Sequence, residues 1–217
     1  MNVVERKISE TKDVIFDYMA LIDTMLIRTL QGSKEKNWDM VKDVINILEP
    51  QADQKKLEIT QDCLGILALY HPEASHLRSI IKMSGMASDL ERMGDLITKI
   101  ARSTYHWQDA YNIGDYPKII EMAEENRKML TDVSRAFMEE NILMAVTVIQ
   151  HDDRVDELCT ILIKQLIKEM NIAENVEYLL QIMNITRNFE RMADVCTHLA
   201  EDIIFIKEGL IPNKNDD

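Results

Sequence analysis

The sequence contains little glycine and proline, with 6 Gly and 4 Pro among 217 residues. Average usage is about 7% Gly and 5% Pro, so this scarcity argues against a loop-rich β-sandwich or a disulfide-stapled mini-fold. Aromatic residues make up only 6% of the chain, although hydrophobic residues reach 46%. The apolar content is therefore mainly Leu, Ile, Ala and Met, residue types that favour helices.

Cysteine and long apolar runs are also scarce. Cys63, Cys159 and Cys196 lie far apart in apolar stretches, without the paired spacing of a zinc finger, which predicts reduced core residues. The first residues lack the apolar run of a signal peptide, and no stretch approaches the roughly 18 apolar residues of a membrane span. We therefore expect a cytoplasmic protein without direct membrane insertion.

Positively charged residues are the minority: the chain has 38 Asp and Glu but only 25 Lys and Arg, which gives a net charge of −13. This balance disfavours nucleic-acid backbones and anionic lipid surfaces as partners. It also suggests that the chain would need a metal to attract an anion such as phosphate. The sequence shows no Ser/His/Asp order, Gly-rich phosphate loop or nucleotide fingerprint. We therefore predict no catalytic residues and no enzymatic activity.

The spacing of apolar residues predicts six helices, over residues 3–31, 35–70, 72–105, 117–140, 141–170 and 173–208. Gly32 is expected to end the first helix, Pro50 to interrupt the second, and Pro72 to begin the third. Residues 114–117 form the clearest loop.

The third and sixth predicted helices repeat each other. With a shift of 99 residues, 90–101 fall on 189–200, and six of twelve positions are identical. A shift of 103 places Glu49 and Asp53 on Asp152 and Asp156. The sequence therefore predicts an all-α fold of two tandem three-helix bundles related by an internal repeat. The first repeat is expected over residues 1–112 and the second over 117–211, with a flexible tail over 212–217.

Acidic pairs recur at the same positions of the two repeats. Glu91 and Asp95 are four residues apart, on neighbouring helical turns at the border of the apolar face, as are Glu190 and Asp194. Partly buried carboxylates about 6 Å apart repel by about 2.8 kcal/mol at an effective dielectric of 20. A cluster of them must take up protons or bind cations. All-oxygen ligands favour Mg²⁺, Mn²⁺, Ca²⁺ or iron over a structural zinc.

Other readings of the acidic and histidine residues stay open. The carboxylates also fit a solvated helix edge on a plain helical scaffold. Glu73 and His76 have the E-x-x-H spacing of di-iron bundles, but the motif occurs once where two copies are required. His198 lies one turn after Asp194 and is a further candidate for the acidic cluster. A ferritin-like metal-dependent enzyme or metal-storage bundle is therefore the alternative function.

Several segments resemble the PhoU family of phosphate-signalling regulators. They are residues 67–78, 88–95, 152–158, 188–194 and 200–209, and they include the doubled E-R-x-x-D of the two repeats. The resemblance covers essentially the whole chain. It implies two three-helix bundles packed side by side, with multinuclear iron or zinc clusters held by the E/D-x-x-x-D pairs.

The resemblance also implies metal ligands and partners. The implied ligands are Glu49, Asp53, Glu91 and Asp95 in the first repeat and Asp152, Asp156, Glu190 and Asp194 in the second. The implied function is a metal-binding adaptor that negatively regulates phosphate uptake and phosphate-starvation signalling. Its partners would be the ATPase subunit of a phosphate ABC transporter and a sensor histidine kinase, and a homodimer is compatible with this role.

The first-repeat site departs from the family pattern. Pro50 lies between Glu49 and Asp53, where it removes a backbone N–H and can kink the helix. Lys99 and Arg102 bring positive charge to the same repeat. We therefore expect the second-repeat site to bind metal more strongly.

Overall fold

The computed structural model describes residues 2–110, 112–172 and 176–209, which are almost entirely helical. The elements are α1 (Val3–Glu35), α2 (Trp38–Asp43), the π-helical turn η1 (Val44–Leu48), α3 (Glu49–Tyr70), α4 (Ala74–His106), the 3₁₀ turn η2 (Ile113–Asp115), α5 (Pro117–Glu139), α6 (Ile142–Met170) and α7 (Glu177–Glu208). No strand occurs in these ranges. The predicted all-α fold of two three-helix repeats is confirmed. The predicted tail and the predicted start of the last helix at residue 173 fall outside the described residues.

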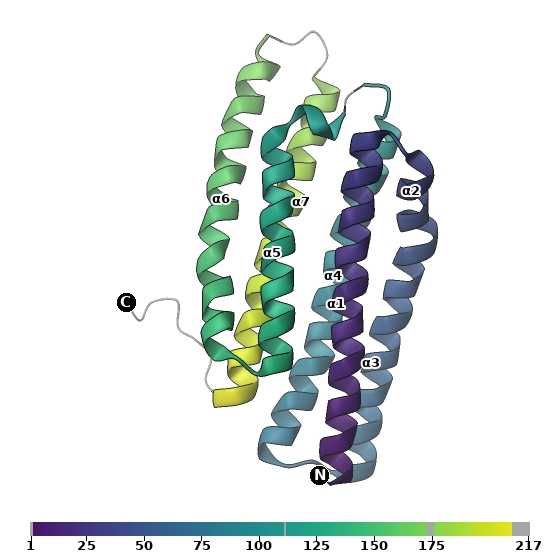
Figure 1. The fold of residues 1–217 in the computed structure, drawn as a ribbon, viewed down its shortest axis with the longest axis vertical. Coiled ribbons are helices and arrows are strands. Elements are labelled where there is room, and N and C mark those ends of the chain that lie inside the picture. The colour runs from purple at the N-terminus through teal and green to yellow at the C-terminus, as the bar shows by residue number, and fades with distance from the viewer. Residues whose placement is uncertain (1, 111, 173–175, 210–217) are drawn as a thin grey trace.

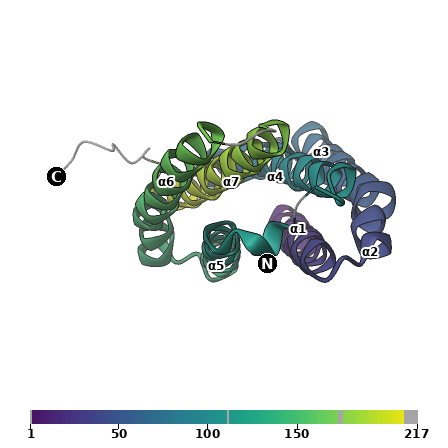
Figure 2. The same ribbon diagram turned by 90° about the horizontal axis from the view of Figure 1, so that it is seen from above.

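The two repeats lie side by side (Figure 1). Seen from above, α6, α7, α4 and α3 form one curved layer, and α5 and α1 lie next to each other in the second layer (Figure 2). The repeats meet where α4 packs on α7 and α1 packs on α5. Since α4 and α7 run in opposite directions (Figure 1), the start of each faces the end of the other along this seam.

The core follows from the helical spacing of apolar residues. In α1, for example, Ile15, Met19, Ile22 and Leu26 are all buried, as expected for one face of a helix. Cys63, Cys159 and Cys196 are buried and form no disulfide, as the sequence predicted. Within the described ranges, no helix combines the length and hydropathy needed to cross a membrane.

The prediction that Gly32 ends the first helix is wrong. Helix α1 continues through it to Glu35, and Lys36 then adopts a left-handed conformation. The glycine is required by a close approach instead. A Cβ atom at Gly32 would lie 2.9 Å from Cγ2 of Val41 and 3.0 Å from the backbone oxygen of Asn37. Its small size therefore serves the packing of α2 on α1.

Pro50 interrupts the regular hydrogen bonding of the second predicted helix but does not end it. The residues before it form η1, where the N–H of Glu49 donates to the carbonyl of Val44 five residues earlier. Pro50 then occupies the first turn of α3. Proline cannot donate to the carbonyl four residues before it and its ring crowds that carbonyl, so a widened π turn accommodates it within a continuous helical path.

Pro72 also differs from its prediction, because α4 begins two residues later at Ala74. Glu73 is the extended N-cap of α4, with φ −111° and ψ 159°, and Pro72 belongs to the preceding connection. By contrast, Pro117 is the first residue of α5, where its missing N–H leaves no helical hydrogen bond unmade.

Candidate functional site

The first-repeat acids are carried by α3 and α4, which pack against each other. Tyr18 of α1 is buried, and burial raises the pKa of its hydroxyl. The charges of Glu91, Asp53 and Asp95 add to this increase, in that order. These three predicted ligands therefore lie around one buried hydroxyl. The sequence gives no sign of this proximity, because Tyr18 lies on a different helix from all three acids.

Cations already neutralise part of the first-repeat cluster. Lys56 Nζ lies 2.9 Å from Oε2 of Glu91, and Arg102 lies 3.7 Å from Oε1 of Glu49. Arg102 was expected to weaken this site, but Lys56 was not anticipated, since only the packing of α3 on α4 brings it to Glu91. Lys99 lines a groove between α4 and α7 instead.

The second-repeat acids are carried by α6 and α7. Burial raises the pKa of the Glu190 carboxyl, and the neighbouring charges of Asp194 and Asp156 raise it further, while Arg191 and Arg187 oppose this increase. The same burial raises the pKa of Cys159 to about 11, with Glu190 and Asp156 adding to it. The structure therefore brings Asp156, Glu190 and Asp194 together.

Asp152 lies one turn before Asp156 in α6, where its charge adds to the burial that raises the pKa of the Cys196 thiol. Among the described residues, Glu190 and Asp194 have no Lys or Arg within ion-pair distance, in contrast to Glu49 and Glu91. Carboxylates that repel one another without a paired cation are suited to a hard metal ion. The donor chemistry of the second repeat therefore fits a cation.

The side chains are not arranged as a closed metal site. Across the described ranges, no three His, Cys, Asp or Glu side chains are gathered closely enough to hold one ion. The predicted ligands are thus neighbours along and between helices, and ion binding would require rotation of their side chains. Such rotation is accessible to Asp156, which is exposed, and to Glu190 and Asp194, which are half-buried.

His198 belongs to the seam between the repeats. Burial raises the pKa of Asp89 on α4 and of Asp202 on α7, and the nearby His198 acts in the opposite direction on both carboxyls. Lys82 joins this group, with Nζ 2.6 Å from Oδ1 of Asp202 and 4.9 Å from the centre of the Phe205 ring. This histidine therefore contributes to a contact between α4 and α7.

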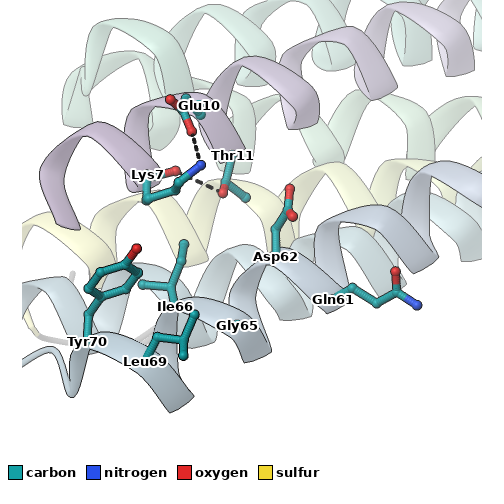
Figure 3. Close-up of a pocket in the computed structure, with 9 residues that line it drawn as sticks. All are labelled: Lys7, Glu10, Thr11, Gln61, Asp62, Gly65, Ile66, Leu69 and Tyr70. Carbon is teal, nitrogen blue, oxygen red and sulfur yellow. Dashed lines mark hydrogen bonds and ion pairs between the residues drawn. The ribbon is translucent and has the colours of Figure 1, made fainter. Parts of the chain in front are cut away.

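A cavity of about 170 Å³ lies between the start of α1 and the end of α3 (Figure 3). The polar groups on its α1 side contact each other, and Gln61 and Asp62 of α3 also line it. Lys7 Nζ lies 2.6 Å from Glu10 Oε2, and the Thr11 hydroxyl donates to the backbone carbonyl of Lys7. The opposite wall is largely apolar, with Ile66, Leu69 and Tyr70 projecting from α3. This arrangement gives no nucleophile with an adjacent base.

Comparison with known proteins identifies related chains along nearly the whole length. The model of the PhoU domain family matches residues 16–104 and again residues 119–203. A phosphate-specific transport system accessory protein PhoU homolog of Aquifex aeolicus is 29% identical over 207 residues, covering 95% of this chain and 93% of the relative. A PhoU homolog of Borreliella burgdorferi with the same designation is 28% identical over 224 residues, covering 95% and 97%.

Solved structures show the same fold. The crystal structure of the phosphate transport system regulatory protein PhoU from Streptococcus pneumoniae has a TM-score of 0.89 at 24% identity, covering 97% of this chain and 99% of that one. PhoU from Pseudomonas aeruginosa has a TM-score of 0.89 at 24% identity, covering 95% and 99%. These structures support the two-repeat architecture, and each of the two matches of the family model falls within one repeat.

Proposed function

The chain belongs to the PhoU domain family, and on this premise we propose that it is an accessory protein that regulates a phosphate transport system. The observation that carries the proposal is the match of the PhoU domain to both repeats, together with relatives of similar length named as phosphate-specific transport accessory proteins. In this proposal the protein acts in the cytoplasm and restrains both phosphate uptake and phosphate-starvation signalling when phosphate is abundant.

The protein would act by contact rather than by catalysis, on the ATPase subunit of a phosphate ABC transporter and on a sensor histidine kinase. Exposed apolar residues on α3 support a docking role. Leu57 and Leu64 are seven residues apart, on one face of the helix, with relative exposures of 48% and 60%. Exposed apolar side chains of this kind occur at the centres of protein interfaces.

A strain lacking the gene tests the regulatory role. A reporter of a phosphate-starvation promoter should become active in phosphate-rich medium when the gene is deleted, and the wild-type gene should restore repression. An unchanged reporter in the deletion strain would contradict the proposal. The Leu57→Asp/Leu64→Asp variant should restore repression poorly and co-purify less transporter ATPase or kinase. Leu180→Asp, at a site on α7 that is 46% exposed, is the control and should behave as wild type.

The proposal includes a cation site in the second repeat. Asp156, Glu190 and Asp194 would hold the ion, with Asp152 beside them, and the family resemblance favours a multinuclear iron or zinc cluster, with Mg²⁺ or Mn²⁺ as the alternative. A bound cation would neutralise these carboxylates and link α6 to α7. The support is the pKa of Glu190, which burial raises first and the charges of Asp194 and Asp156 raise further, against the opposing effect of Arg191 and Arg187. Among the described residues, neither Glu190 nor Asp194 forms an ion pair with a lysine or arginine.

Metal analysis of the purified protein tests this site. Glu190→Ala/Asp194→Ala should lower the metal content, whereas the repeat-matched Glu91→Ala/Asp95→Ala variant should lower it less, because Lys56 already compensates Glu91. Equal metal content in the second-repeat variant and the wild type would contradict the assignment. Circular dichroism should show unchanged helical content in both variants.

A further inference from the structure

A groove between α4 and α7 gathers positive charge in an otherwise acidic protein. Its volume is about 320 Å³. Lys99, Arg187 and Arg191 supply three cationic side chains, and the rest of the lining is Ser103, Gln181, Asn184, Ile185 and Asn188. Ser103 Oγ donates to Oε1 of Gln181 at 3.3 Å and joins the two helices. None of the three cations lies within ion-pair distance of a carboxylate among the described residues.

The internal repeat provides a matched comparison for this groove. With the shift of 99 residues, Ser103 corresponds to Asp202 and Gln181 corresponds to Lys82. The Ser103–Gln181 contact at one end of the α4–α7 seam and the Lys82–Asp202 contact at the other end are therefore equivalent. The seam therefore has an approximate two-fold symmetry in these contacts, with different side chains at its two ends.

The two ends differ in how their cations are compensated. At the Lys82 end, the carboxylates of Asp89 and Asp202 lie near Lys82, and Asp202 forms an ion pair with it. In the groove, the equivalent positions are the uncharged Asn188 and Ser103. Arg187 adds a further cation where the other repeat has Ser88. The substitution of neutral hydrogen-bonding groups for both carboxylates leaves the lining of the groove without an acidic side chain, although Arg187 and Arg191 also act on the nearby Glu190.

We propose that this groove binds a phosphoryl oxyanion, either free inorganic phosphate or a phosphate group of a nucleotide. Guanidinium groups match the oxygens of phosphate with paired hydrogen bonds, and the two arginines lie one turn apart on α7. The amides of Asn184 and Asn188 supply further donors. The net charge of −13 suggested that an anion would need a metal to bind, but the local charge of this groove supplies the attraction directly.

A neighbouring depression bears on the identity of the ligand. It has a volume of about 600 Å³ and shares Lys99 and Ser103 with the groove, and its lining includes Tyr105 and Trp107. An aromatic surface beside a phosphate site suits the stacking of a nucleotide base. Because the ligand would contact both α4 and α7, it would stiffen the joint between the repeats. Its role as a regulatory signal rests on the proposed function, whereas binding itself does not.

Calorimetry on the purified full-length chain tests the groove, in EDTA and at constant ionic strength, with inorganic phosphate and ADP as separate probes. At least one probe should bind saturably, and Arg187→Gln/Arg191→Gln should weaken its affinity at least tenfold. Ser103→Asp/Asn188→Asp, which installs the carboxylates of the other repeat, should weaken it equally. Arg92→Gln, at the position equivalent to Arg191, should leave the affinity unchanged.

The probes separate the two ligand sources. Binding of phosphate without a stronger response to ADP assigns the free anion, and tighter binding of ADP that Trp107→Ala weakens assigns a nucleotide. The inference is wrong if the wild type binds neither probe, or if both groove variants bind as the wild type does. A chain that restores reporter repression but binds neither probe refutes only this inference. A chain that binds but does not restore repression refutes only the proposed function.

Discussion

Lys82 of α4 donates a hydrogen bond to Asp202 of α7 across the seam between the repeats, at 2.6 Å. The Asp202 side chain is only 14% exposed. Loss of the lysine would therefore leave a largely buried carboxylate without its partner, which is more costly than the pair itself is stabilising.

Lys82→Met should accordingly lower the free energy of unfolding by about 2–3 kcal/mol, measured by urea denaturation at pH 7. Gln181→Met changes the equivalent position of the other repeat, where the partner is the uncharged Ser103. It should cost only about 0.5–1 kcal/mol, the worth of an ordinary hydrogen bond. Equal losses of unfolding free energy in the two variants would show that the charge of Asp202 does not determine the effect of Lys82→Met.

The pH dependence of stability should also depend on Asp202. Burial raises the pKa of its carboxyl above the usual value of 3.8, against the opposing effect of Lys82. The folded protein therefore holds this proton more tightly than the unfolded chain, and stability falls as pH rises from about 3.8 through the folded-state pKa. Asp202→Asn removes this titration, so it should gain stability relative to wild type over that interval. A difference independent of pH would contradict the assignment.

Glu140 should show the opposite pH dependence. Hydrogen bonds from Lys12 and then Lys207 lower the pKa of its carboxyl to about 2, so this residue ties α1 to α7 at the end of α5. Its contribution is present above the unfolded pKa of about 4.5 and is lost as pH falls toward 2.

Glu140→Gln should reduce stability by about 0.5–1 kcal/mol at pH 7, because the pair is partly exposed, and the difference from wild type should shrink between pH 4.5 and 2. Chemical denaturation over this pH range measures it. Glu139→Gln is the adjacent control, since Glu139 is exposed and its ion pair within the described ranges is with the exposed Arg135, at 3.8 Å. A pH-independent loss in Glu140→Gln would argue against the ion pairs as its cause.

Replacement by alanine should have opposite effects on stability at two of the glycines, Gly94 and Gly32. A Cβ atom at Gly94 would meet the flexible tip of Ile22 at 3.3 Å, and the other repeat already has Ala193 at this position. Gly94→Ala should raise stability by about 0.5–1 kcal/mol through helix propensity. Gly32→Ala should lower it by about 1–3 kcal/mol, since its Cβ would meet the backbone of Asn37 at 3.0 Å. Thermal unfolding of both variants measures these changes in stability. A change in the same direction in both variants would contradict the packing explanation.

The sequence by itself determined the helical class and the repeat. Apolar residues at a period of 3.6 define a helix locally, and the repeated E-R-x-x-D reports a duplicated unit whatever its surroundings. The outcomes at Gly32 and Pro50 became visible only in the folded chain. The close passage of α2 explains the glycine, and a widened turn, which spacing does not encode, accommodates the proline.

For the acidic residues, too, the sequence determined one part of the outcome and the fold determined the other. Spacing along one helix placed Glu91 beside Asp95 and Glu190 beside Asp194, because residues four apart share a face. Which carboxylates are neutralised was decided by the packing of helices, since Lys56 reaches Glu91 from α3. The cationic groove also exists only in the folded protein, because the antiparallel packing of α4 on α7 brings Lys99 to Arg187 and Arg191. A net charge of −13 is a sum over the chain, whereas binding depends on the few charges that the fold places together.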